Sequence, residues 1–299
     1  MGILVVGSAA LDSVQTPHGK VKEALGGSAV YFAVSASFFT SIKLVAVVGE
    51  DFPQEHVNFL KRKNIDIEGL EIVGGETFRW KGRYTGDMNT AHTLSTCLNV
   101  FEKFHPKLPE NYRESKYIFL ANIDPGLQLE VLKQVKNPKL VASDTMNLWI
   151  SLVPGVLKKT LKHVDMLIIN DAEIKQFSGE DNIVRASRKV LQFGPKAVVV
   201  KRGEFGSMMF TGNSIFSVPA YPLDRVVDPT GAGDTFAGGL MGYLSKTDNI
   251  KEGNIRKAII YGTVMASFNV QDFSLDRMKK LTVKEINNRF NEISKLTSF

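Results

Sequence analysis

The most informative segment of this 299-residue chain reads Asp228-Pro229-Thr230-Gly231-Ala232-Gly233-Asp234-Thr235-Phe236. Two glycines flank Ala232 where a loop has to turn into a helix, and an apolar helix face continues from Phe236. Such a loop presents free backbone N–H groups and the positive end of the helix dipole, which together bind anions. A carboxylate would repel a bound phosphate, but it could accept a proton from a hydroxyl that attacks that phosphate. Asp234 is therefore our candidate general base, and the alternative is a helix-capping residue.

Short apolar runs recur along the chain, and each is closed by a glycine or a polar residue. Runs of this length predict strands that are buried on both faces, as in parallel sheets. Helical patterns lie between the runs and continue near the C-terminus over about 232–245, 252–270 and 283–296. We therefore expect a single α/β domain over residues 1–299, with a mostly parallel central sheet flanked by helices. The predicted strands are Ile3–Val6, Leu44–Val48, Tyr117–Ala121, Leu140–Ala142, Met166–Ile169 and Ala197–Val200.

Ligands of such sheets bind beyond the carboxyl ends of the strands. Several polar side chains follow the predicted strands, so we expect them to gather at one edge of the sheet. They are Asp12, Asn122, Asp144, Asn170 and Lys201.

Two segments break the pattern of the central sheet. From Thr77 to Tyr84 aromatic residues alternate with basic ones, and a second alternation runs from Leu94 to Val100 after a turn at 86–89. Period-two alternation predicts half-exposed antiparallel strands. We expect a small β lid formed from about residues 13–24 and 71–101, or, alternatively, an edge hairpin without a function. If the aromatic face of this hairpin borders the site, stacking favours a nucleobase or the face of a sugar.

The composition excludes several classes of protein. Lys and Arg total 37 against 31 Asp and Glu, a net charge of +6, but the basic residues form no run and no nucleic-acid reader motif is present. With Cys97 as its single cysteine, the chain can form no intramolecular disulfide. A signal peptide and a long apolar run are both lacking. We expect a cytoplasmic protein that binds a small molecule, with neither a nucleic acid nor a membrane as partner.

The segment from Asp228 to Asp234 resembles the C-terminal signature D-x-T-G-A-G-D of the ribokinase-like, or PfkB, carbohydrate kinases. The resemblance implies that the backbone of Gly231, Ala232 and Gly233 forms an anion hole for the transferring phosphoryl group. It also implies that Asp234 activates the acceptor hydroxyl, with ATP and Mg²⁺ as cofactors.

Further elements appear in the order that the family has them. Gly26-Gly27 resembles its substrate-binding glycine pair, and Asp12 its early aspartate that holds sugar hydroxyls. Ribokinase-type sequences carry asparagine four residues after the second glycine, whereas this chain has Tyr31, which we include in the substrate site. This departure argues against ribose itself and leaves the acceptor open.

Asn170 and Glu173 resemble the N-x-x-E element of the family, which is linked to magnesium. The resemblance implies that they hold the ion through water. Alternatively, the same spacing fits a capping box at the start of a helix. The resemblance implies a nucleotide site on another set of residues. These are Lys201, Gly203, Gly206, Thr230 and Asn269.

The sequence thus predicts an ATP-dependent kinase that phosphorylates a hydroxyl of a sugar or sugar-like molecule. A nucleoside kinase of the same fold is the first alternative, and a non-catalytic nucleotide-binding regulator is an alternative of another class. The resemblance is compatible with a homodimer through the lid and leaves the need for a monovalent cation open.

Overall fold

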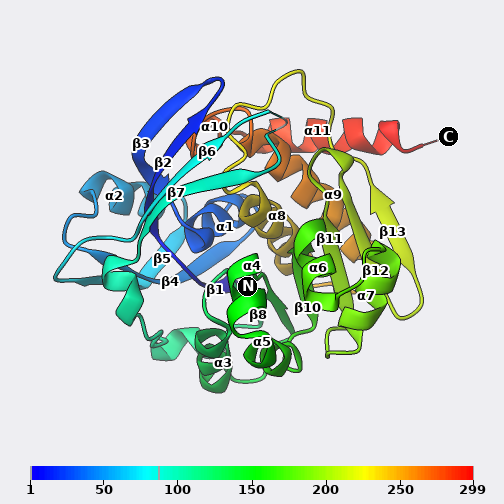
Figure 1. The fold of residues 1–299 in the computed structure, drawn as a ribbon, viewed down its shortest axis with the longest axis horizontal. Helices are drawn as coiled ribbons and strands as arrows, with labels where there is room; N and C mark the ends of the chain where they lie inside the picture. The colour runs from blue at the N-terminus through cyan, green and yellow to red at the C-terminus, as the bar shows by residue number, and fades with distance from the viewer. Residues whose placement is uncertain (1, 87, 299) are drawn as a thin grey trace.

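A computed structural model describes residues 2–86 and 88–298 (Figure 1). Over these residues a nine-stranded sheet has the order β13-β12-β11-β10-β9-β8-β1-β4-β5. The strands from β5 to β11 pair in parallel, and β12 and β13 continue antiparallel. This confirms the expected fold class. The strands are β1 (Gly2–Val6), β4 (Ser41–Gly49), β5 (Ile65–Val73), β8 (Tyr117–Leu120), β9 (Leu140–Ser143), β10 (Met166–Asn170), β11 (Ala197–Lys201), β12 (Ser207–Thr211) and β13 (Ile215–Val218).

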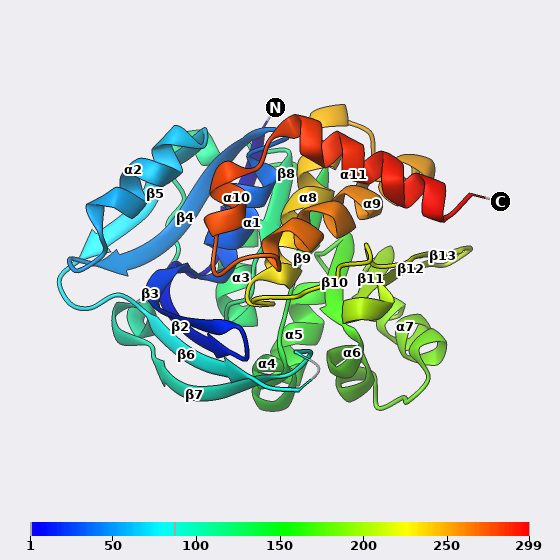
Figure 2. The same ribbon diagram turned by 90° about the horizontal axis from the view of Figure 1, so that it is seen from above.

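Helices cover both faces of the central sheet (Figure 2). One layer contains α1 (Ser28–Ala36), α2 (Gln54–Arg62), α8 (Ala232–Thr247), α9 (Glu252–Asn269), α10 (Asp276–Lys280) and α11 (Val283–Leu296). The other contains α3 (Pro125–Gln134), α4 (Asn147–Leu152), α5 (Pro154–Leu161), α6 (Asp171–Ser178) and α7 (Ile183–Leu191). Within residues 2–86 and 88–298, no helix has the length and apolar character needed to cross a membrane.

Apart from the edge strand β5, the parallel strands are mostly apolar because each faces two cores. Ile3 and Val5 of β1 pack with α1 and α8, whereas Leu4 and Val6 pack into the core on the opposite face. The other parallel strands alternate in the same way. Burial on both faces explains why the sequence shows continuous apolar runs rather than alternation.

A second sheet, which we call the lid sheet, differs in detail from the expected hairpin. Over the described residues it has four strands in the order β3-β2-β6-β7, namely β3 (Gly19–Gly26), β2 (Ala10–Thr16), β6 (Arg79–Tyr84) and β7 (Ala91–Cys97). Residues 71–73 belong instead to β5, and Asn99–Lys103 form a 3-10 helix. The parallel pairing of β2 with β6 could not be predicted from the sequence pattern, because this pairing joins segments far apart in the chain. Asp87, in the turn expected at 86–89, lies outside the described residues.

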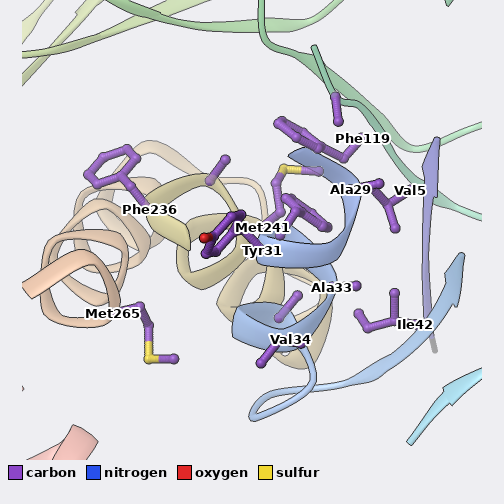
Figure 3. Packing of buried hydrophobic residues seen from close by; sticks show 14 of the residues in the cluster. Val5, Ala29, Tyr31, Ala33, Val34, Ile42, Phe119, Phe236, Met241 and Met265 are labelled. Carbon is purple, nitrogen blue, oxygen red and sulfur yellow. The ribbon is translucent and has the colours of Figure 1, made fainter. Parts of the chain in front are cut away.

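Close packing of α8 against α1 fixes the position of the glycine-rich loop, because this loop leads directly into α8. A Cβ atom at Gly238 would come within 2.4 Å of the backbone oxygen of Phe32 and 2.7 Å of Ser35 Cβ. Figure 3 shows Tyr31 of α1 among the side chains at this contact, beside Met241 of α8. Glycine therefore lets the two helices approach where any side chain would hold them apart.

We predict that Gly238→Ala destabilises the protein by about 1–3 kcal/mol, since a methyl group at this position meets backbone rather than a flexible side chain. Gly253→Ala in α9 is the matched control: its Cβ meets nothing within 4 Å, so it should stabilise by up to about 1 kcal/mol. Urea unfolding measures both. Equal stability of Gly238→Ala and the wild type would contradict this account.

Candidate active site

A cleft of about 1110 Å³ lies between the lid sheet and the carboxyl ends of the central strands. Asp12, Asn122 and Asn170 line it, and Asp144 and Lys201 lie together beside it. The structure thus brings together the polar side chains that follow the predicted strands. Parallel strands end at one edge of a sheet, so this grouping follows from the topology.

The glycine-rich loop forms the start of α8 at the floor of this cleft. Gly231 is the N-cap with φ of 73°, a conformation that favours glycine. A Cβ atom at this position would lie 2.4 Å from the ring of Tyr31, so only glycine leaves room for that ring. The N–H of Ala232 donates to the carbonyl of Pro229 at 3.1 Å. Gly233 follows in the first turn of the helix, where N–H groups lack intrahelical partners. An anion at this loop would therefore meet the N–H of Gly233 and the positive end of the helix dipole.

Asp234 is half-buried and lines the cleft one residue further along α8. Loss of solvent raises the pKa of its carboxyl to about 8, and the carboxylates of Asp144 and Asp12 add to this, whereas Lys201 opposes it. A carboxyl group with such a pKa can take up a proton near neutral pH.

Lys201 ends β11 and forms an ion pair with Asp144 at the end of β9, with 2.9 Å between Nζ and Oδ2. Their side chains are 17% and 6% exposed. Burial alone would lower the pKa of Lys201, but the carboxylates of Asp144, Glu173 and Asp234 raise it above its usual value. Lys201 is therefore a charged ammonium group among acidic side chains.

Three of the expected substrate residues, Asp12, Gly27 and Tyr31, line the same cleft. Asp12 of β2 is buried, and a Cβ at Gly26 would lie 1.9 Å from its Oδ2 atom, so only glycine admits this carboxyl group. Burial raises the pKa of Asp12 to about 7, and the carboxylate of Asp228 contributes to this increase. A hydrogen bond from the backbone of Gly27 acts in the opposite direction and lowers the pKa. A buried carboxylate facing a cleft can accept hydrogen bonds from two hydroxyls of a ligand.

The lid sheet reaches the glycine-rich loop directly. The hydroxyl of Thr230 lies 3.4 Å from that of Tyr84, which ends β6. Tyr31 lies 2% exposed beneath this contact and lines the cleft. Burial raises the pKa of Tyr84 to about 12, so its phenol stays neutral.

Asn170 and Glu173 form the capping box of α6: Asn170 Oδ1 accepts from the Glu173 N–H at 2.8 Å, and Glu173 Oε2 from the Asn170 N–H at 3.0 Å. Burial, with Asp144, raises the pKa of Glu173 to about 7. In the part of the chain that the structure describes, no group of three or more His, Cys, Asp or Glu could hold a metal. The oxygen donors here suit a magnesium ion bound mostly through water and phosphate.

The expected nucleotide residues are only partly brought together. Gly203 and Gly206 form the turn between β11 and β12, where Gly206 has φ of 82° and touches the backbone of Val218. Asn269 is fully buried instead of bordering a nucleotide: its amide donates to the carbonyl of Thr230 at 2.8 Å. Its Oδ1 atom accepts from the hydroxyl of Thr235 at 3.2 Å. Asn269 therefore links α9 to the glycine-rich loop and to the first turn of α8.

Sequence reasoning missed much of the cleft wall. Trp149 donates to Asn122 Oδ1 at 3.0 Å, and the Asn122 amide contacts the Met146 sulfur at 3.1 Å. A signal was available, because Met146 and Trp149 follow Asp144 directly at the end of a predicted strand. Besides Tyr31, the Phe, Tyr and Trp side chains that line the cleft are Phe78, Trp80, Tyr84, Phe101, Phe104 and Trp149.

Known proteins resemble the chain over nearly its whole length. The cytidine kinase of Thermococcus kodakarensis is 28% identical over 258 residues, which cover 84% of this chain and 91% of the relative. The nucleoside kinase structure of Methanocaldococcus jannaschii is 22% identical, with a TM-score of 0.77 over 97% of this chain and 98% of the other. A fructokinase structure of Vibrio cholerae with bound fructose, ADP and calcium is 17% identical, with a TM-score of 0.77 and the same coverage.

Residues 2–280 match the family described as pfkB family carbohydrate kinase. Members of this family use ATP together with a metal ion. A second relative, 25% identical over 262 residues, is named as the nucleoside kinase of Methanocaldococcus jannaschii. The chain belongs to the pfkB carbohydrate kinase family and is a phosphotransferase.

Proposed function

We propose that this protein transfers the γ-phosphoryl group of Mg-ATP to a hydroxyl group of a nucleoside. The observation that carries this proposal is the aromatic wall of the cleft, which continues from the buried carboxylate of Asp12. Asp12 suits the sugar hydroxyls, and the rings of Phe78 and Trp80 suit the flat face of a base. A free sugar would leave this apolar part of the cleft unfilled.

Asp234 would act as the general base. In the reaction the acceptor oxygen bonds to the γ-phosphorus, its proton passes to the Asp234 carboxylate, and ADP leaves with the electron pair of the broken bond. Gly233 and the dipole of α8 would stabilise the charge on the transferring group. Asn170 and Glu173 would hold the magnesium ion through water, and the ion would neutralise phosphate charge.

The lid sheet would close over the acceptor and exclude water, which otherwise takes the phosphoryl group. The contact of Tyr84 with Thr230 supports this, because it joins β6 to the glycine-rich loop. A homodimer would use β7, an edge strand whose residues are all exposed.

The acceptor is tested by measuring ADP release from Mg-ATP with nucleosides, ribose, fructose and inositol. We expect a nucleoside to give the highest kcat/KM. Asp234→Asn is the blank, and its kcat should fall by about 10²–10⁴-fold because the proton acceptor is lost, with ATP affinity retained. Turnover with a sugar alone would overturn the nucleoside assignment, and an active Asp234→Asn would overturn the base.

We predict that Trp80→Leu raises the KM for the nucleoside about tenfold or more, because stacking on a base contributes roughly 1–3 kcal/mol. The KM for ATP should not change. Lys81→Ala is the matched control, since Lys81 is the next residue of β6 and is exposed on the other face. An unchanged nucleoside KM in Trp80→Leu would place the base elsewhere.

Glu173→Gln separates the capping role from the metal role. Glutamine can still accept the Asn170 N–H, so the melting temperature should stay near that of the wild type. The Mg²⁺ concentration for half-maximal rate should rise about tenfold, because second-shell and ligand changes cost 10–100-fold in metal affinity. Glu285→Gln alters the other capping box, on α11, and should leave the Mg²⁺ dependence unchanged. A normal Mg²⁺ requirement in Glu173→Gln would restrict Glu173 to capping.

A further inference from the structure

The ammonium group of Lys201 lies against the anion-binding turn itself. A Cβ atom at Gly233 would lie 2.8 Å from Lys201 Nζ, the nearest atom to that position. The absence of a side chain at residue 233 therefore makes room for a cation as well as for a phosphate. The side chain of Lys201 thus extends from the end of β11 to the start of α8.

Asp144 fixes this ammonium group in place. Its Oδ2 atom receives the ion pair at 2.9 Å, and its Oδ1 atom accepts from the Thr145 N–H at 2.8 Å. The backbone carbonyl of Asp144 accepts from the side chain of Gln128 at 3.1 Å. Because both the side chain and the backbone of Asp144 are held by hydrogen bonds, the ion pair restricts the position of the Lys201 ammonium group.

Lys201 is a cation surrounded by acidic side chains. The carboxyl groups of Asp144, Glu173 and Asp234 all act on it, and it is the cation that acts on both Glu173 and Asp234. Negative charge that develops on the transferring phosphoryl group meets repulsion from these carboxylates, and a fixed cation beside Gly233 offsets that repulsion. Positive charge placed where negative charge develops accelerates phosphoryl transfer.

We propose that Lys201 is a catalytic residue that donates a hydrogen bond to a non-bridging oxygen of the transferring phosphoryl group, with Asp144 as its positioning residue. Lys201 stays protonated throughout. The acceptor oxygen forms its bond to phosphorus, the bond to ADP breaks, and the acceptor proton goes to Asp234. The proposal rests on the phosphotransfer site described above, and it assigns Lys201 to the reacting group rather than to nucleotide affinity.

A double variant distinguishes a catalytic role of Lys201 from a purely structural one. Lys201→Met alone leaves the buried carboxylate of Asp144 without its partner and is expected to lower stability. Lys201→Met with Asp144→Asn replaces the pair by neutral side chains of similar shape, which restores stability. We expect the double variant to melt within a few degrees of the wild type while its kcat stays about 10²–10³-fold lower, as for loss of one stabilising donor.

The KM values separate catalysis from binding. The KM for the acceptor should change by less than about threefold in the double variant, and so should the affinity for ATP, since an interaction made only in the transition state lowers kcat. Recovery of near wild-type kcat with recovered stability would overturn the proposal, as would a large loss of ATP affinity with normal kcat.

The pH profile tests Asp144 by a second route. Asp234 is faced by Asp144 from β9, Lys201 from β11, Asp12 from β2 and Tyr84 from β6. Asp144→Asn removes a negative charge and should shift the acid limb of kcat/KM to lower pH, whereas Lys201→Met should shift it to higher pH. Shifts in the same direction, or none, would contradict the arrangement.

Another ion pair of this sheet is the control. Lys196, just before β11, pairs with Asp165 at 2.8 Å and is 82% exposed. Lys196→Met should leave kcat and the pH profile unchanged. Asp234→Asn, assayed in parallel, reports on the general base independently, so failure of that assignment is distinguishable from failure of the role of Lys201.

Discussion

The approach of α8 to α1 holds the glycine-rich loop against the ends of the central strands. Gly238 permits that approach, Tyr31 packs on Gly231, and Asn269 holds the carbonyl of Thr230 from behind. As a result Asp234 projects into a cleft already bordered by other carboxyl groups. Its raised pKa follows from this placement, because removal of solvent and neighbouring negative charge both disfavour the ionised form.

Because α8 packs on α1 in this way, the central sheet and the lid sheet contribute different residues to the cleft. The central sheet supplies the reacting end of the cleft, where Lys201 and Asp144 meet the start of α8. The lid sheet supplies Asp12, Trp80 and Tyr84, and Tyr84 joins it to Thr230. An acceptor between the sheets would therefore be oriented by one and phosphorylated at the other. Precise orientation of two reactants is a large part of what an active site provides.

The sequence predicted the layered fold because strands buried on both faces, such as Ile3–Val6, leave continuous apolar runs. It also predicted which strand ends carry polar side chains, and Asp144 and Lys201 do meet. It predicted the small β lid as well, but not the parallel pairing of β2 with β6, because that pairing is long-range. Asn269 was placed by its position in a helix, whereas its burial depends on how α9 packs on α8. The cleft wall at Trp149 is likewise a tertiary feature with only a local hint in the sequence.

The ionisation of Asp234 tests the central claim most directly. Carboxyl ¹³C resonances of protein labelled at aspartate can be followed by NMR from acid to alkaline pH, with Asp234→Asn to assign the signal. The account predicts a signal that titrates near pH 8 in the free protein and is missing from the variant. Titration of Asp234 close to the ordinary aspartate pKa of about 3.9 would contradict it, since the carboxyl group would then be neither desolvated nor crowded by negative charge.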